Sequence, residues 1–89
     1  MSPLLLTGVS LDDVQKNPDG IIEAVANTLG IPPEEVSIDQ IYETDKGVVV
    51  EARHPTVAET PKDFARQVNR LLRARRPYTK VIVKSPGNR

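Results

Sequence analysis

The sequence predicts an α+β fold in which two helices pack on one face of a four-stranded antiparallel sheet. Three observations support this class. The elements read in the order strand, helix, strand, strand, helix, strand; each crossover contains a helix; and the only hairpin lies in the middle of the chain. Because crossover connections are strongly biased to one hand, we expect the first and third strands in the centre of the sheet and the second and fourth at its edges.

The first strand and the first helix are marked by an apolar run and by helix-capping residues. Residues 3–9 form a short apolar run closed by a glycine, which predicts the first strand. A serine followed by two acids predicts a separate helical turn at residues 11–16. Asn17 as N-cap and Pro18 as first helical residue then begin the first helix proper. This helix is expected to end at Leu29, because Gly30 is a typical residue just after a helix.

The middle of the chain predicts a β-hairpin. Residues 36–43 alternate between apolar and polar side chains and then change phase, which predicts a bulge near Gln40. Residues 44–47 supply the turn, with Gly47 free to adopt a positive φ. Residues 48–53 are rich in β-branched side chains and predict the third strand.

The last third of the chain predicts a helix followed by a strand. Thr60 as N-cap and Pro61 as first helical residue would begin the second helix, which we expect to end near Ala74. Residues 78–84 predict the fourth strand. We place one domain at residues 1–85 and a flexible tail at residues 86–89. The order β-α-β-β-α-β is that of the ferredoxin-like sandwich.

Charge is divided unevenly along the chain. Residues 1–61 hold three bases and eleven acids, a net charge of −8, whereas residues 62–89 hold nine bases and one acid, a net charge of +8. Placed on the predicted fold, the acids fall on edge strand two and the bases on edge strand four. Such an asymmetry bears on partners and assembly rather than on the fold itself.

These edges lead us to expect a non-enzymatic protein-interaction or assembly domain, whose partner is another protein or a second copy. Unpaired edge strands accept further strands, and edges of opposite charge favour a head-to-tail contact, although edge lysines also protect against pairing. The exposed sheet face, with Leu5, Val49 and Ile82, is an equally good docking surface. The expected interaction residues are Asp39, Glu43, Asp45, Arg73, Lys80 and Lys84.

The alternative function is sequence-independent binding of nucleic acid. An arginine-rich helix can contact phosphates with a strong dependence on salt. The residues expected to do so are Arg66, Arg70, Arg73, Arg75 and Arg76. However, ferredoxin-like RNA readers stack bases on aromatic residues of the two central strands, and the central strands expected here contain none.

Catalysis has little support in the sequence. His54 is the only histidine and there is no cysteine, so we expect no metal and no cofactor. A small enzyme with a site near His54 is the least favoured alternative. The longest apolar run near the start is too short for a membrane span, and we expect a soluble, cytoplasmic protein.

Two families resemble parts of this chain. Residues 36–53, with Gly47-Val48-Val49-Val50 after the turn, resemble the central hairpin of SEA domains, which carry Gly-Ser-Val-Val-Val at their self-cleavage point. Val48 stands where those domains have the serine nucleophile, so the resemblance implies a non-cleaving relative. The segment from the first helix to the last strand is similar to the ring-building motif of secretion and sporulation complexes. Neither resemblance assigns a functional site to this chain.

Overall fold

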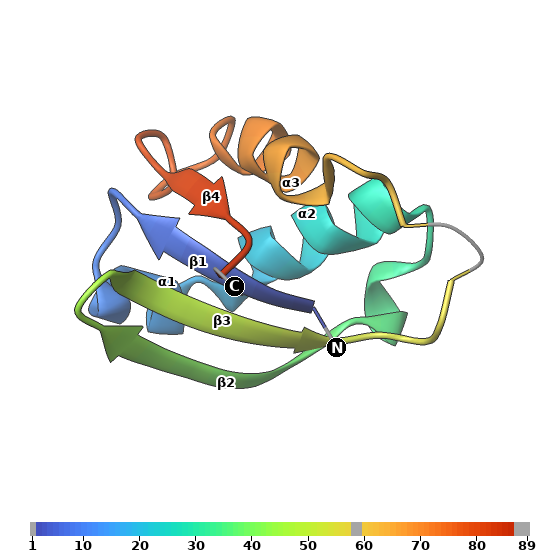
Figure 1. Ribbon diagram of the computed structural model, residues 1–89, viewed down its shortest axis with the longest axis horizontal. Coiled ribbons are helices and arrows are strands. Elements are labelled where there is room, and N and C mark those ends of the chain that lie inside the picture. The colour runs from blue at the N-terminus through green and yellow to red at the C-terminus, as the bar shows by residue number, and fades with distance from the viewer. Residues whose placement is uncertain (1, 58–59, 87–89) are drawn as a thin grey trace.

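The structure is a computed structural model that describes residues 2–57 and 60–86. The chain forms a sheet of strands with helices packed against it (Figure 1). They are β1 (Ser2–Thr7), α1 (Leu11–Lys16), α2 (Pro18–Leu29), the 3₁₀ turn η1 (Pro33–Glu35), β2 (Ser37–Thr44), β3 (Gly47–Arg53), α3 (Phe64–Leu72) and β4 (Ile82–Lys84). Of the predicted tail at residues 86–89, residues 87–89 lie outside the described part of the chain.

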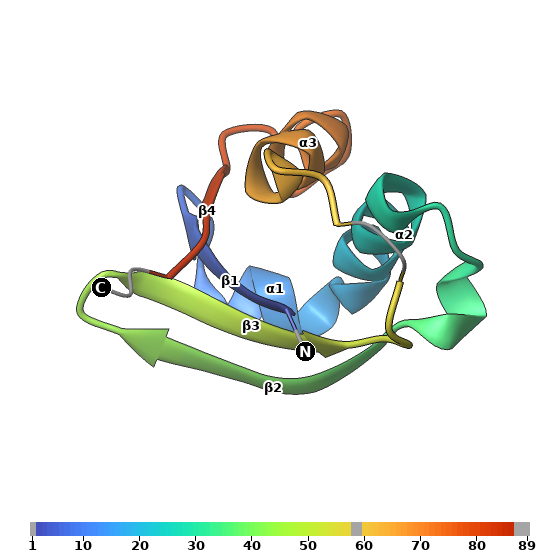
Figure 2. The same ribbon diagram turned by 45° about the vertical axis from the view of Figure 1, so that its right-hand side comes forward.

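The four strands form one antiparallel sheet in the order β2-β3-β1-β4. The predicted α+β class, with its four-stranded antiparallel sheet, is confirmed. The helices cover one face of this sheet and leave the other face open (Figure 2). The described part contains three α-helices, because the separate helical turn expected at residues 11–16 forms α1 in addition to the two helices expected to pack on the sheet. Asn17 adopts φ −132° and ψ 52° between α1 and α2, which divides the first helical segment into two.

The core lies between the helices and the inner face of the sheet. Alternate residues of the central strands point inward, so that Leu4 and Leu6 of β1 and Val48 and Val50 of β3 are almost completely buried. The helices contribute the other half of this layer. Their buried residues are Val14, Ile21, Ala24, Val25, Ala26, Val68 and Leu72.

Most local signals in the first two thirds of the sequence are realised. Ser10 caps α1 by accepting a hydrogen bond from the Asp13 backbone N–H (3.1 Å), and Gly30 ends α2 in the left-handed region at φ 71°. The register between β2 and β3 shifts between Ile38 and Gln40, where a bulge was predicted. These features depend on the backbone preferences of single residues, which are readable in a sequence.

The last helix is shorter than predicted. It begins at Phe64 instead of Pro61, because the backbone N–H of Phe64 bonds to the Pro61 carbonyl and closes a separate turn (3.1 Å). It ends at Leu72 instead of Ala74. The N–H groups of Ala74 and Arg75 bond three residues back, which tightens the chain out of the α-helix.

The fourth strand is also shorter than predicted, at three residues. Two successive turns occupy the preceding segment: the Tyr78 N–H bonds to the Arg75 carbonyl (2.8 Å) and the Val81 N–H to the Tyr78 carbonyl (3.1 Å). Tyr78 is therefore not a strand residue. Its ring is completely buried, and its hydroxyl donates a hydrogen bond to the Asn17 carbonyl (2.6 Å), which joins this segment to the α1–α2 junction.

Candidate functional site

A shallow groove runs between α3 and the edge strand β4. Its volume is about 520 Å³. We refer to it as the α3–β4 groove. The residues that line it are Ala65, Arg66, Asn69, Arg73, Ile82, Val83, Lys84 and Ser85.

Helical and strand periodicity together bring these side chains to one place. Arg66, Asn69 and Arg73 are separated by three and four residues, so they share one side of α3. In β4 the side chains alternate between faces. Val83 points into the core, while Ile82 and Lys84 point to the open face of the sheet. The groove therefore combines the cations of a helix with the surface of an edge strand.

The α3–β4 groove has a positive rim and an apolar floor. Arg66, Arg73 and Lys84 are all exposed, and no acidic residue is among those that line the groove. Within the described residues, none of the three ion pairs involves these cations. Ile82 is 49% exposed, although it is a large aliphatic residue. A surface of this kind attracts an anionic partner that also carries an apolar group.

Asn69 blocks part of the edge of β4. Its side-chain Oδ1 accepts a hydrogen bond from the backbone N–H of Val83 (2.7 Å). In a strand, the backbone N–H and C=O of one residue point to the same side. The backbone N–H and C=O of Val83 therefore both point away from β1, toward the outer edge of the sheet. Because its N–H is already bonded, β4 offers few backbone groups to an additional strand.

The opposite edge of the sheet, β2, carries the acidic residues. Glu43 pairs in register with Val48, whose side chain is buried under the helices. Because paired residues share a face, the side chain of Glu43 points to the helix side of the sheet. Asp39 lies at the bulge. Arg53 neutralises it through Nη2 (2.9 Å) and Nε (3.0 Å), both of which contact Oδ2 of Asp39.

Tyr42 lies on the open face of β2. Its hydroxyl donates a hydrogen bond to Oε2 of Glu51 (3.1 Å). This hydrogen bond raises the pKa of Tyr42, and desolvation and the charge of Glu51 act in the same direction. Tyr42 is 40% exposed, and it and Ile82 are the two large apolar side chains that stand exposed in the described part of the chain. Tyr42 lies on β2 and Ile82 lies on β4, which are the two edge strands of the sheet.

The structure places the predicted interaction residues in different environments. Glu43 and Lys84 lie on the edge strands, and Arg73 is the C-cap residue of α3. Two of these residues lie just outside the edge strands to which their charge was assigned: Asp45 is in the turn between β2 and β3, and Lys80 is in the turn before β4.

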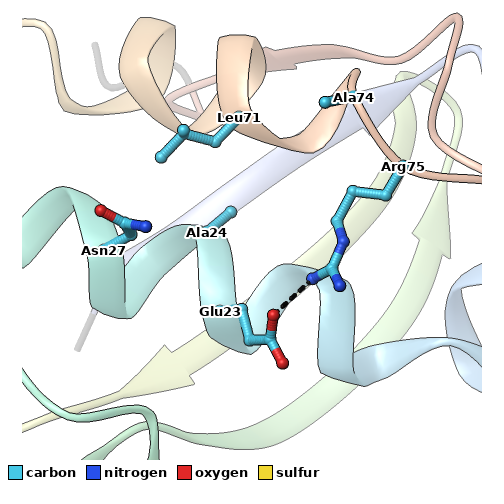
Figure 3. Close-up of a pocket in the computed structure, with 6 residues that line it drawn as sticks. All are labelled: Glu23, Ala24, Asn27, Leu71, Ala74 and Arg75. Carbon is cyan, nitrogen blue, oxygen red and sulfur yellow. Dashed lines mark hydrogen bonds and ion pairs between the residues drawn. The ribbon is translucent and has the colours of Figure 1, made fainter.

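The arginines of the nucleic-acid alternative also separate into two groups. Arg66, Arg70 and Arg73 form one exposed stripe along α3. Arg75 lies beyond the helix and forms an ion pair with Glu23 of α2, at 2.8 Å from Nη1 to Oε1 (Figure 3). Arg76 is exposed in the segment that follows.

Figure 3 shows a second, smaller hollow between α2 and the end of α3. Its volume is about 230 Å³, and its walls are the apolar side chains of Ala24, Leu71 and Ala74. The ion pair of Glu23 and Arg75 closes one side. Both charged side chains are about half exposed, so the pair adds little stability. The hollow brings no nucleophile and base together.

His54 follows β3 and is half-buried, and its Nδ1–H donates to the Pro55 carbonyl (2.8 Å). Residues 2–57 and 60–86 contain no cluster of three or more acidic, histidine or cysteine side chains suited to a metal ion. In the same residues, each helix is too short or too polar to cross a bilayer.

Sequence reasoning missed Asn69 and the exposure of Tyr42. An asparagine in a helix, three residues after one groove arginine and four before the other, was a usable signal. It indicated a polar contact with a neighbouring element, but the partner becomes visible only when β4 is placed beneath α3.

When the chain is compared with models of protein families, with curated proteins and with solved structures, no match is found.

Proposed function

We propose that this chain is a non-enzymatic protein-interaction domain of ferredoxin-like fold, which binds an acidic segment of a partner in the α3–β4 groove. The observation that carries the proposal is that three exposed cations, Arg66, Arg73 and Lys84, line the same groove as the exposed side chain of Ile82. No acid of the described residues is bonded to these cations. The strand order β2-β3-β1-β4 supports the ferredoxin-like assignment.

The chemistry of the groove defines the partner segment. Carboxylates would bind the cations at the rim, and one apolar side chain would cover Ile82. Each exposed ion pair is worth about 0.2–1 kcal/mol, and burial of part of an isoleucine about 1 kcal/mol. Such small contributions sum to about 2–4 kcal/mol, which corresponds to a very weak complex, with a Kd of about 1 mM or weaker, whose affinity falls as salt is added.

A labelled peptide tests this proposal. We expect a fluorescein-labelled decapeptide of alternating Glu and Val to bind the domain in low salt, as measured by fluorescence anisotropy. The double variant Arg66→Ala, Arg73→Ala should bind it about two- to thirtyfold more weakly, because two contacts of about 0.2–1 kcal/mol each are lost. Arg70→Ala is the matched control, since Arg70 is exposed on the same helix but does not line the groove.

The same experiment separates protein binding from nucleic-acid binding. The specific observation in favour of nucleic acid is the stripe of Arg66, Arg70 and Arg73 on α3. If this stripe binds phosphates, Arg70 should contribute as much to the affinity as the other two arginines do. A labelled single-stranded DNA 20-mer replaces the peptide. If the DNA binds, and Arg70→Ala weakens it as much as Arg73→Ala does, the nucleic-acid alternative replaces our proposal. If the peptide does not bind, or if the wild type, the double variant and Arg70→Ala bind it equally, the groove is not the interaction site.

A further inference from the structure

We infer that the segment that occupies the α3–β4 groove is strand β2 of a second copy of this chain, in a head-to-tail contact. This inference rests on the proposed function and names its partner. Three independent features of the structure support it: the directions of the edge strands, the residues that meet in register, and the distribution of charge between the two edges.

The first feature is the direction of the edge strands. All three neighbouring pairs in the sheet are antiparallel, and there are four strands, so β2 and β4 run in opposite directions. A second copy placed beside the first by translation along the sheet therefore presents its β2 antiparallel to β4. The same translation keeps the helices of both copies on one side. Head-to-tail contact thus places β2 of one copy beside β4 of the next with the antiparallel direction that neighbouring strands of the sheet already have.

The second feature is the register. Two rows of paired residues cross the whole sheet, and each ends at both edges. These rows are Tyr42–Val49–Leu5–Lys84 and Glu43–Val48–Leu6–Val83. In a translation along the rows, Tyr42 of one copy meets Lys84 of the next, and Glu43 meets Val83.

The open face of this joint would be apolar. Ile82 lies two residues from Lys84 on the same face of β4, so it is the diagonal neighbour of the incoming Tyr42, within reach of an aromatic ring. The two large apolar side chains left exposed in the described residues would therefore cover each other. In this contact the ammonium group of Lys84 of one copy would also lie within reach of the ring of Tyr42 of the next copy.

The helix face of the joint would be ionic. Glu43 leaves β2 on the helix side of the sheet, and the incoming Glu43 would lie beside Val83. This position is in the α3–β4 groove, whose helix wall carries Arg66 and Arg73. Contacts between two identical edges lack this match. A β2–β2 contact brings Glu43 near its own copy, and a β4–β4 contact gathers six cations, so both symmetric pairings are disfavoured.

Asn69 determines how strong the joint can be. Because Asn69 holds the N–H of Val83, the contact is made mainly by side chains and not by a ladder of backbone hydrogen bonds. An open assembly keeps one unused β2 edge at one end and one unused groove at the other, so the contact gives open chains, or rings where these two ends meet. We expect short, reversible oligomers that dissociate as salt is added.

Sedimentation velocity tests the inference. At 50 mM NaCl and millimolar protein, we expect oligomers that dissociate to monomer at 500 mM NaCl. Glu43→Lys and the double variant Arg66→Glu, Arg73→Glu alter opposite sides of the joint, and each should weaken association at least tenfold. Combining all three substitutions restores the opposite charges and should restore association. Glu34→Lys is the control, since Glu34 is an exposed acid in η1, outside β2 and the groove.

The outcomes distinguish the inference from the proposed function. If the wild type stays monomeric at both salt concentrations, or if Glu34→Lys acts as strongly as Glu43→Lys, the inference is wrong. If the acidic peptide nevertheless binds and depends on Arg66 and Arg73, the proposed function stands with a different partner. If neither self-association nor peptide binding occurs, both are wrong. Circular dichroism of each variant shows whether it is folded.

Discussion

Gly8→Ala is expected to lower the free energy of unfolding by about 2–4 kcal/mol. Gly8 has φ 78°, a conformation that residues with a Cβ atom rarely adopt. A Cβ atom at Gly8 would also collide with the backbone carbonyl oxygen of Lys80, which cannot move like the end of a side chain. This contact joins the end of β1 to the turn before β4, so the substitution should also displace one wall of the groove.

Gly30→Ala is the matched control for this prediction. Gly30 has a similar φ of 71°, but a Cβ atom there meets nothing within 4 Å. The Gly30→Ala variant should therefore lose only the stability that the strained backbone conformation costs, about 1 kcal/mol. Urea unfolding of the two variants measures the difference, which isolates the collision with Lys80. Equal losses in the two variants would show that the turn before β4 is not held against Gly8.

The stability of the domain is expected to fall between pH 10 and pH 12 because of Tyr78. Burial raises the pKa of Tyr78 to about 12, and the charge of Asp13 acts in the same direction. In the unfolded chain a tyrosine loses its proton near pH 10. Between these values the unfolded state binds fewer protons than the folded state, so stability is complete below pH 10 and is lost as the pH approaches 12. The loss should be on the order of 2 kcal/mol.

Tyr78→Phe separates this effect from the titration of other groups. The variant should be less stable at neutral pH by about 1 kcal/mol, because it lacks the hydrogen bond to the Asn17 carbonyl. Between pH 10 and pH 12 it should lose less stability than the wild type does. Urea unfolding at several pH values measures both curves. Parallel curves over this range would contradict a buried, protonated Tyr78.

The parts of the fold that follow local rules could be predicted from the sequence. The ends of α2, the hairpin turn at Gly47 and the bulge before Gln40 each depend on a few adjacent residues. The errors lie where a distant contact decides the local structure. Residues 78–84 are rich in β-branched side chains, as a strand is, yet Tyr78 is held in the core by its contact with Asn17, 61 residues away. No local pattern contains that information.

The interaction surface was predictable in its charge but not in its geometry. The net charges of −8 in residues 1–61 and +8 in residues 62–89 suggested two opposite surfaces. Folding mixes them in part, because Arg75 pairs with Glu23 and Arg53 with Asp39. What remains is smaller and more specific: the cations of the α3–β4 groove, and Glu43 on β2. The hydrogen bond from Val83 to Asn69 decides how open the edge is, and it needed the placement of α3 over β4.

Chemical shift mapping tests most directly the claim that the two edges of the sheet meet. Amide spectra of the labelled protein would be recorded in 50 mM NaCl at about 20 µM and about 1 mM. We expect concentration-dependent shifts in two sets of residues, 40–46 of β2 and its turn, and 65–73 with 82–85 around the groove. Both sets should return to their dilute positions in 500 mM NaCl, while residues 18–29 of α2 stay unchanged. Shifts in only one of the two sets, or shifts centred on α2, would contradict a head-to-tail contact.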